Sequence, residues 1–249
     1  MSTTKADQLQ IIAQGRAGSR NLRLPLCSAI VHSLLLLGFT LLCAPLIFAA
    51  DSASVGFSLD FPNSAPEHYS FTVQSDGQAH YESSGRISAD SDERLDYQTD
   101  FAFSDATRAR IFALAARAQY FSGKIDSGNK KLAFTGAKKL TYKDGQRSNV
   151  ADYNFSSVPA VQQLTAIFQG VAATLEYGRR LTFYHQYQKL ALDGELKRME
   201  DQAVHGELAE IQAIKPVLQQ IYEDGSVINV VRARAQRIME MKLAPVPGG

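Results

Sequence analysis

The sequence of 249 residues contains no tryptophan and only two cysteines. Both cysteines, Cys27 and Cys43, lie in the one long apolar segment of the chain, residues 24–50. The part of the chain after this segment therefore has no cysteine, which excludes disulfides, thiolate metal sites and a cysteine nucleophile there. Its stability must come from a packed core, and it is long enough to build one.

Sequence signatures of common catalytic sites are missing as well. No Gly-x-Ser-x-Gly stretch marks a serine nucleophile, and no glycine-rich loop ends in the Gly-Lys-Ser/Thr that binds phosphate. The histidines after the apolar segment lack the HxH, HExxH and Cys₂His₂ spacings of metal sites; they are His68, His80, His185 and His205. We therefore expect surface histidines, and we predict no catalytic residue, no cofactor and no bound metal.

Two further patterns are weak indications of a site. Asp90, Asp92 and Glu93 stand close together, but the glycine and the twelfth-position carboxylate of an EF-hand loop do not accompany them. We expect a solvated acidic loop there. Asn154 begins a stretch that matches the glycosylation pattern Asn-x-Ser, which also arises often by chance.

Charge is nearly balanced once the N-terminal residues are set aside. Residues 51–249 contain 22 lysines and arginines and 24 acidic residues, a net charge of −2, whereas the whole chain has +1. Nucleic-acid-binding domains carry clustered excess positive charge, so we predict no nucleic-acid partner. We expect the basic residues near the C-terminus to lie on the solvent-exposed face of a helix. Contact with anionic lipid headgroups is the alternative. These basic residues are Arg232, Arg234, Arg237 and Lys242.

The apolar segment indicates export of the residues C-terminal to it. Residues 24–50 contain no charged side chain and exceed the ~20 residues that a membrane-spanning helix needs. Residues 1–23 have a net charge of +3, and no lysine or arginine occurs after the segment until Arg86. Basic flanks stay in the cytoplasm, so we predict a cytoplasmic leader and a C-terminal part outside.

Two interpretations of residues 24–50 remain open. A cleaved signal peptide needs small residues at positions −1 and −3, which a cut after Ser52 provides, and polar interruptions with Pro45 shorten the apolar core. The length of the segment favours an uncleaved anchor. The first interpretation predicts a periplasmic or extracellular protein. The second predicts an inner-membrane protein whose partner, through residues 24–50, is the membrane.

Alternating apolar and polar residues predict β-strands after this segment. Residues 52–61 alternate, and residues 69–83 alternate on both sides of an Asp-Gly pair. Asp-Gly supplies the positive φ of a tight hairpin turn. A second hairpin is predicted at 138–155, also around Asp-Gly. Residues 95–103 predict a strand with one apolar and one wet face, so helices should cover one side of an antiparallel sheet.

Helical patterns come later. Ser104 is a favourable N-cap for a helix that ends near residue 121, and Pro159 suits the first turn of the next helix. Further on, one long helix is predicted over 183–203. A second covers 208–221 and is kinked or restarted at Pro216, and a third is capped by Ser226.

These patterns predict an α+β fold: an antiparallel sheet of hairpins covered by helices, followed by a C-terminal helical section. The predicted division is a basic leader (1–23), the apolar segment (24–50), an α+β domain (51–178), the helical section (179–243) and a frayed tail (244–249).

Three C-terminal stretches resemble exported bacterial proteins of unknown function, of the kind found in acidobacteria; they are residues 190–200, 208–218 and 226–232. The first predicted hairpin and the helix after it are similar to small bacterial domains of unknown function. The resemblance covers most of residues 55–243. It implies export and brings no catalytic residues.

The hypothesis that fits best is a non-enzymatic exported binding or interaction module whose C-terminal helices contact a protein partner. A secreted hydrolase with a carboxylate site that the sequence does not reveal is one alternative. A membrane-tethered assembly subunit is the other.

Overall fold

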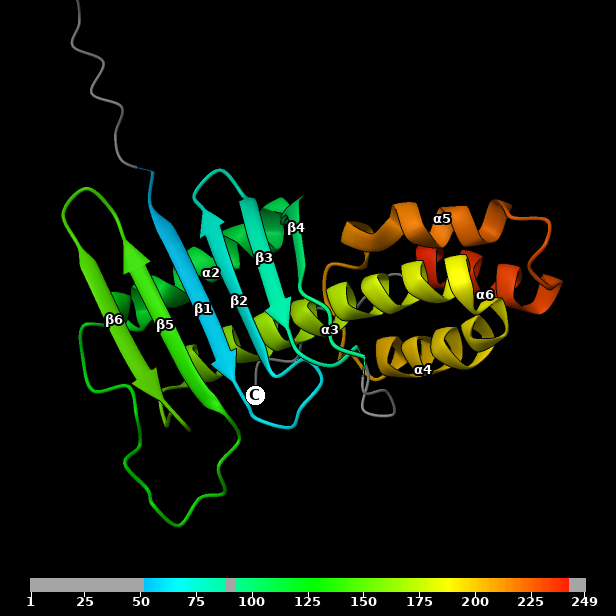
Figure 1. Ribbon diagram of the computed structural model, residues 1–249. Coiled ribbons are helices and arrows are strands. Elements are labelled where there is room, and N and C mark those ends of the chain that lie inside the picture. Colours follow the sequence, from blue (N-terminus) through cyan, green and yellow to red (C-terminus); the bar gives the residue numbers. More distant parts are fainter. Residues whose placement is uncertain (1–51, 88–92, 242–249) are drawn as a thin grey trace, which may run out of the picture. The chain divides into compact units, whose positions relative to one another are not determined.

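Six antiparallel strands form one sheet in the computed structural model, which describes residues 52–87 and 93–241. The strands are β1 (Ser54–Asp60), β2 (His68–Gln74), β3 (Gln78–Ser84), β4 (Tyr97–Ala102), β5 (Ala137–Lys143) and β6 (Ser148–Tyr153). Their order across the sheet is β4-β3-β2-β1-β5-β6, which places the first strand in the middle (Figure 1). The predicted antiparallel sheet of hairpins is confirmed.

The two Asp-Gly pairs form the two predicted hairpins, but their turns differ. Gly77 has φ of 95° and closes the three-residue loop between β2 and β3, as a positive-φ glycine should. Asp76 accepts a hydrogen bond from the Gln78 N–H in that turn, and Asp144 likewise accepts from the N–H groups of Gln146 and Arg147, but Gly145 has no positive φ. Each turn is therefore specified by local chemistry.

One face of the sheet carries the core. Side chains of β1 and β2 alternate as expected, and Phe57 and Phe71 are 2% exposed. The helices α2 (Asp105–Arg117) and α3 (Pro159–Tyr187) lie on this face (Figure 1). Phe168 of α3 stacks on Phe57, with ring centroids 5.1 Å apart and planes 4° apart. The prediction that helices cover one side of the sheet is confirmed.

The starts of these two helices agree with the sequence. Ser104 caps α2, and its side chain accepts a hydrogen bond from the backbone N–H of Thr107. Pro159 occupies the first turn of α3, where its missing N–H costs no hydrogen bond. The N-cap residue of α3 is Val158, and its N–H donates to the Ser156 hydroxyl, which in turn donates to the Ile125 carbonyl 2.7 Å away.

The C-terminal helical section contains α4 (Leu192–Val204), α5 (Lys215–Glu223) and α6 (Asn229–Glu240). Short 3₁₀ turns precede α4 and α5, at η2 (Lys189–Ala191) and η3 (Ile211–Ile214), and a third, η1 (Gln119–Phe121), comes after α2. The predicted α+β fold with a C-terminal helical section is confirmed.

A single helix, α3, extends from the sheet into the helical section. It has 29 residues and continues through residues 178 and 179, where the composition of the chain changes. Gly178 allows η3 to approach, since a Cβ at this position would lie 2.5 Å from the Cγ2 of Ile214. The N-terminal part of α3 therefore packs on the sheet, and the C-terminal part of the same helix belongs to the helical section.

Three predictions about the helices are wrong in detail. The helix predicted over residues 208–221 does not begin at Leu208, because Glu210 has a positive φ of 56° and helical structure starts only at Ile211. The chain does not continue as one helix over residues 183–203, because Gln188 leaves the helical region with φ of −145° and ψ of 59°. Ser226 does not cap α6. Its N–H and hydroxyl both donate to Asp224 in the preceding turn, and Ile228 is the N-cap residue. The predicted restart at Pro216 is confirmed, since α5 has this proline in its first turn.

No helix within residues 52–87 and 93–241 is long and apolar enough to cross a membrane. Residues 24–50, Asp90, Asp92 and Lys242 lie outside the described residues, so the predictions about them stay predictions.

Candidate functional site

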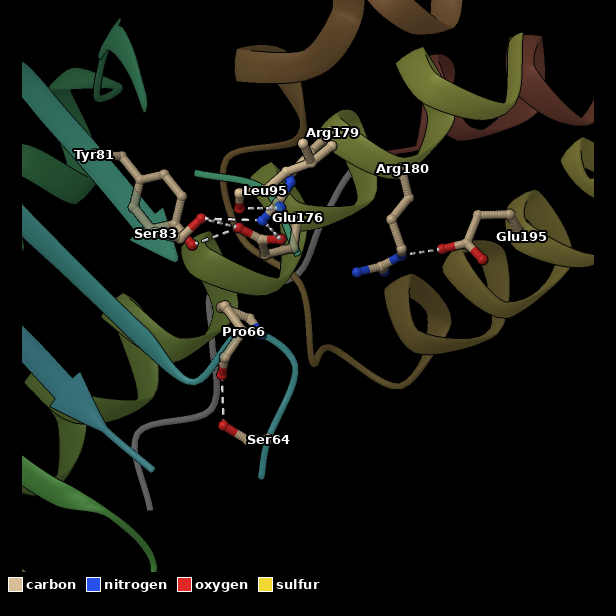
Figure 2. A network of polar contacts seen from close by, with 9 residues as sticks. All are labelled: Ser64, Pro66, Tyr81, Ser83, Leu95, Glu176, Arg179, Arg180 and Glu195. Atoms are coloured by element: carbon tan, nitrogen blue, oxygen red, sulfur yellow. Dashed lines mark hydrogen bonds and ion pairs between the residues drawn. The ribbon is translucent and has the colours of Figure 1, made fainter. Parts of the chain in front are cut away.

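The centre of the candidate site is the carboxylate of Glu176, which α3 holds against the sheet (Figure 2). Glu176 is 3% exposed. One of its oxygens accepts hydrogen bonds from the Tyr81 hydroxyl at 2.9 Å and the Ser83 hydroxyl at 2.6 Å, both on β3. The other oxygen lies 3.2 Å from a guanidinium nitrogen of Arg179, three residues along the helix. Both oxygens of this buried carboxylate are therefore engaged.

The partners of Glu176 are fixed in turn. Arg179 also donates to the backbone carbonyl of Leu95, just before β4. Burial, with the carboxylate of Glu176 adding to it, holds the pKa of Tyr81 well above its usual value of 10. The Tyr81 hydroxyl thus keeps its proton and donates it to the carboxylate of Glu176 in a hydrogen bond. A buried ion pair with all of its hydrogen bonds made fixes one arrangement of the elements that contribute to it.

A second buried carboxylate connects α3 to the helical section. Glu195 of α4 has a side chain that is 2% exposed. It accepts from Nε of Arg180 at 2.6 Å and from Arg198 at 2.5 Å. Arg179 and Arg180 are neighbours in sequence, yet one points to the sheet and the other to α4 (Figure 2). Adjacent arginines therefore connect α3 to the sheet on one side and to α4 on the other.

A hollow of about 420 Å³ opens beside these two pairs. The loop after β1 contributes Ser64 and Pro66 to its wall, and α3 contributes Gln169, Tyr177 and Arg180. Figure 2 shows this loop on the sheet side of the network. The wall of the hollow mixes apolar and aromatic side chains with polar and charged ones.

The four predicted surface histidines lie at separate places, and each has a partner. His68 contacts Asp60 at 2.6 Å and His80 contacts Asp100 at 2.7 Å, both across the open face of the sheet. His185 contacts Asp224 at 2.9 Å, and His205 contacts the backbone carbonyl of Asp201 at 2.8 Å. In the part of the chain that the structure covers, no three potential ligands gather around a metal position.

The strand register brings three residues together that the sequence pattern did not connect. Asp60, His68 and Ser84 are direct cross-strand neighbours on β1, β2 and β3. Activation of a serine needs a hydrogen bond from its hydroxyl to the histidine. The described residues contain the bond from His68 to Asp60 but none from Ser84 to His68. This row therefore gives the hydrolase alternative no support.

Two basic residues of the last helix, Arg234 and Arg237, face acids of the same chain, whereas Arg232 donates to the Tyr222 carbonyl and to Asn229. Arg234 donates to Asp193 and, at 3.0 Å, to Glu200, and Arg237 donates to Glu200 at 2.9 Å. These contacts hold α6 against α4. Arg234 and Arg237 thus have protein partners, as a helix packed through its ion pairs should.

Replacement of Glu200 by glutamine should change how stability depends on pH. The hydrogen bond from Arg237, aided by Arg234, holds the pKa of Glu200 below its usual value of 4.5. A lowered folded-state pKa means that these contacts stabilise the fold fully above about pH 4.5 and lose their effect as the pH falls further. Glu200→Gln should therefore flatten the loss of stability between about pH 5 and pH 3, measured by urea unfolding.

The matched control is Glu240→Gln, because Glu240 accepts a hydrogen bond from the neutral Gln236 at the surface. This variant should keep the slope of the unmodified protein. If stability depends on pH equally in all three proteins, the ion pairs of Glu200 do not contribute to that dependence.

Large apolar side chains lie exposed at one end of the helical section. Tyr187 is 66% exposed, Leu190 93%, Ile228 59% and Val230 51%. Lys189 joins them, since its ammonium group donates to Asp224 and Ser226 in the α5–α6 turn. We name the four apolar side chains the distal apolar surface, and Figure 1 shows its elements at the end of α3 farther from the sheet.

Neither the protein-family models nor the curated proteins compared with this chain give a match. The geometry of the molecule itself is therefore the basis for interpreting its sites.

Proposed function

We propose that the chain is an exported, non-enzymatic module that binds a protein partner through the distal apolar surface. The observation that carries the proposal is the exposure of Leu190, a leucine that lies almost wholly in solvent three positions after the largely exposed Tyr187. Contiguous exposed apolar side chains mark interaction surfaces more often than scattered ones do. Aromatic side chains are enriched at the centres of such surfaces.

The surroundings of this surface support the same proposal. The α5–α6 turn beneath it is fixed, because Asp224 accepts hydrogen bonds from His185, Lys189 and Ser226. These bonds hold the pKa of Asp224 far below its usual range, chiefly through Lys189. The apolar side chains therefore stand on a preorganised base, which lowers the entropic cost of binding.

The partner that fits this surface is a protein with an apolar groove or pocket. Leucine and tyrosine side chains that project from a rigid base act as anchors in a complementary cavity. The buried carboxylates of Glu176 and Glu195 form ion pairs with arginines of the same chain. This structural use of both carboxylates supports the non-enzymatic part of the proposal.

Site-specific photocrosslinking in cells tests the proposal. A photoreactive phenylalanine analogue in place of Leu190 should give a discrete crosslinked protein. The matched control position is Val150 on β6, which is 59% exposed and lies outside the surface. The double substitution of Tyr187 and Ile228 by serine should abolish the adduct at position 190.

The same double variant should change the free energy of unfolding by less than about 1 kcal/mol, since both side chains are exposed. Identical adducts at positions 150 and 190, or an adduct that survives the double substitution, would refute the proposal.

The export part of the proposal has its own test, which also separates a free module from a membrane-tethered one. Mass spectrometry of the mature N-terminus in fractionated cells decides between them. A start at residues 51–53 in the soluble fraction would refute the anchor, and an intact residue 1 in membranes would refute cleavage.

A further inference from the structure

Arg180 has hydrogen-bond donors that its own chain does not use. Its side chain is 14% exposed, and its Nε donates to Glu195. Within residues 52–87 and 93–241, the two terminal nitrogens of the guanidinium have no partner. Both nitrogens reach solvent, because the described residues contain no buried side-chain nitrogen without a hydrogen-bond partner. These nitrogens are therefore available to an acceptor from outside the chain.

The available nitrogens face the hollow described above. Arg180 is part of its wall, and Figure 2 shows the end of the guanidinium turned from Glu195 toward the side on which Pro66 lies. The guanidinium lies over the ring of Tyr177, 4.5 Å from its centroid, and the stacking fixes the plane of the donors. The arginine is thus preorganised.

The charged residues that line the hollow are Arg180 and Glu176. The ion pairs contain three arginines (Arg179, Arg180 and Arg198) and two carboxylates (Glu176 and Glu195). Each carboxylate has an arginine partner, and the third arginine, Arg198, does not line the hollow. The carboxylate of Glu176 also lines the hollow, but both of its oxygens already accept hydrogen bonds, so it does not compete for the arginine.

We propose that this hollow binds a small organic carboxylate, whose anionic group pairs with the free end of Arg180 and whose apolar body fills the hollow. Arginine binds carboxylates through parallel N–H donors. The walls that Leu59, Tyr69 and Ala173 contribute are apolar or aromatic, and they suit a hydrocarbon or aromatic body. The volume of about 420 Å³ lies in the range of small-molecule sites. This inference is independent of the protein-binding surface.

Ligand-observed NMR with the full chain tests the proposal, with benzoate as probe and benzamide as its neutral analogue. Benzoate should bind saturably and at least about ten times more tightly than benzamide, because only benzoate makes charge-assisted hydrogen bonds. Inorganic phosphate at equal concentration should not displace benzoate, since it has no apolar body.

Two substitutions localise the binding. Arg180→Gln should weaken benzoate binding about tenfold or more. Ala173→Leu should abolish binding by filling the hollow while it leaves every ion pair in place, so it remains informative if the first variant does not fold. The matched control is Arg198→Gln, which removes the other arginine of Glu195, one that does not line the hollow. It should leave binding within about threefold.

Four results would each overturn the proposal. They are the absence of saturable benzoate binding, equal binding of benzoate and benzamide, unchanged binding in Arg180→Gln or Ala173→Leu, and displacement of benzoate by phosphate. The last result would assign the hollow to inorganic anions.

Discussion

Replacement of Glu176 by glutamine is expected to lower the free energy of unfolding by about 3–5 kcal/mol. The substitution leaves the guanidinium of Arg179, whose side chain is 6% exposed, without its ionic partner. It also removes the charged acceptor of the Tyr81 and Ser83 hydroxyls, which are themselves buried. An unpaired buried charge costs far more than an ion pair contributes, so the loss should exceed that of any surface pair.

Urea unfolding followed by circular dichroism measures this loss. The matched control is Lys139→Gln, which breaks an exposed pair with Asp152 at 3.8 Å and should cost less than about 1 kcal/mol. The combined substitution of Glu176 and Arg179 by glutamine should cost less than the sum of the single variants, because it leaves no charge alone. If Glu176→Gln costs no more than the control, the network does not hold α3 to the sheet.

Phe168→Ala should also lower the free energy of unfolding by about 3–5 kcal/mol. The Phe168 ring is fully buried and contacts the rings of Phe57 and Phe71, with centroids 5.1 Å and 5.4 Å away. Its removal leaves a cavity between α3 and the middle of the sheet. Because both packing partners belong to rigid strands, the cavity cannot collapse cheaply.

The thermal unfolding midpoint and the urea midpoint both report this change. Phe168→Leu keeps much of the buried volume and should lose clearly less than the alanine variant. Leu190→Ala, at a position 93% exposed, should stay within about 0.5 kcal/mol of the unmodified protein. Similar values for the alanine variants at 168 and 190 would show that the stack does not contribute to stability.

Features that depend on neighbouring residues could be predicted from the sequence. Gly77 comes directly after Asp76 between two alternating stretches, and a positive-φ turn at that place folds the strands on each other whatever the rest of the chain does. Ser104 stands directly before an amphipathic stretch, so its role as a cap is also local. Such features need no knowledge of the fold.

The candidate site depends on contacts between distant residues, and the sequence could not reveal it. Glu176 and Tyr81 are 95 positions apart, and alternation on β3 shows only that Tyr81 faces the core. The spacing of Glu176 and Arg179 is the spacing of a helical ion pair, which is usually a surface feature. One signal was present: Arg179 stands four positions after Leu175 and so continues the apolar stripe of α3, which places a charge on the buried side.

The break after α3 shows a different limit of sequence reasoning. Residues 183–203 have the apolar periodicity of one helix, and helical propensity gives no reason for a stop at Gln188. The stop coincides with contacts to the α5–α6 turn, where Lys189 reaches Asp224. Tertiary contacts from 35 residues away thus accompany an end that periodicity did not indicate.

The central place of β1 in the sheet has a consequence for how the chain can acquire its structure. β1 pairs with β2 almost at once, but its other edge waits for β5, whose residues are synthesised only after β2, β3, β4 and α2. Until then β1 offers a row of unpaired backbone groups to any other strand, and pairing between distant strands is slow. The second edge of β1 therefore stays open until β5 has been synthesised, and a chain truncated before Ala137 would keep that edge open permanently.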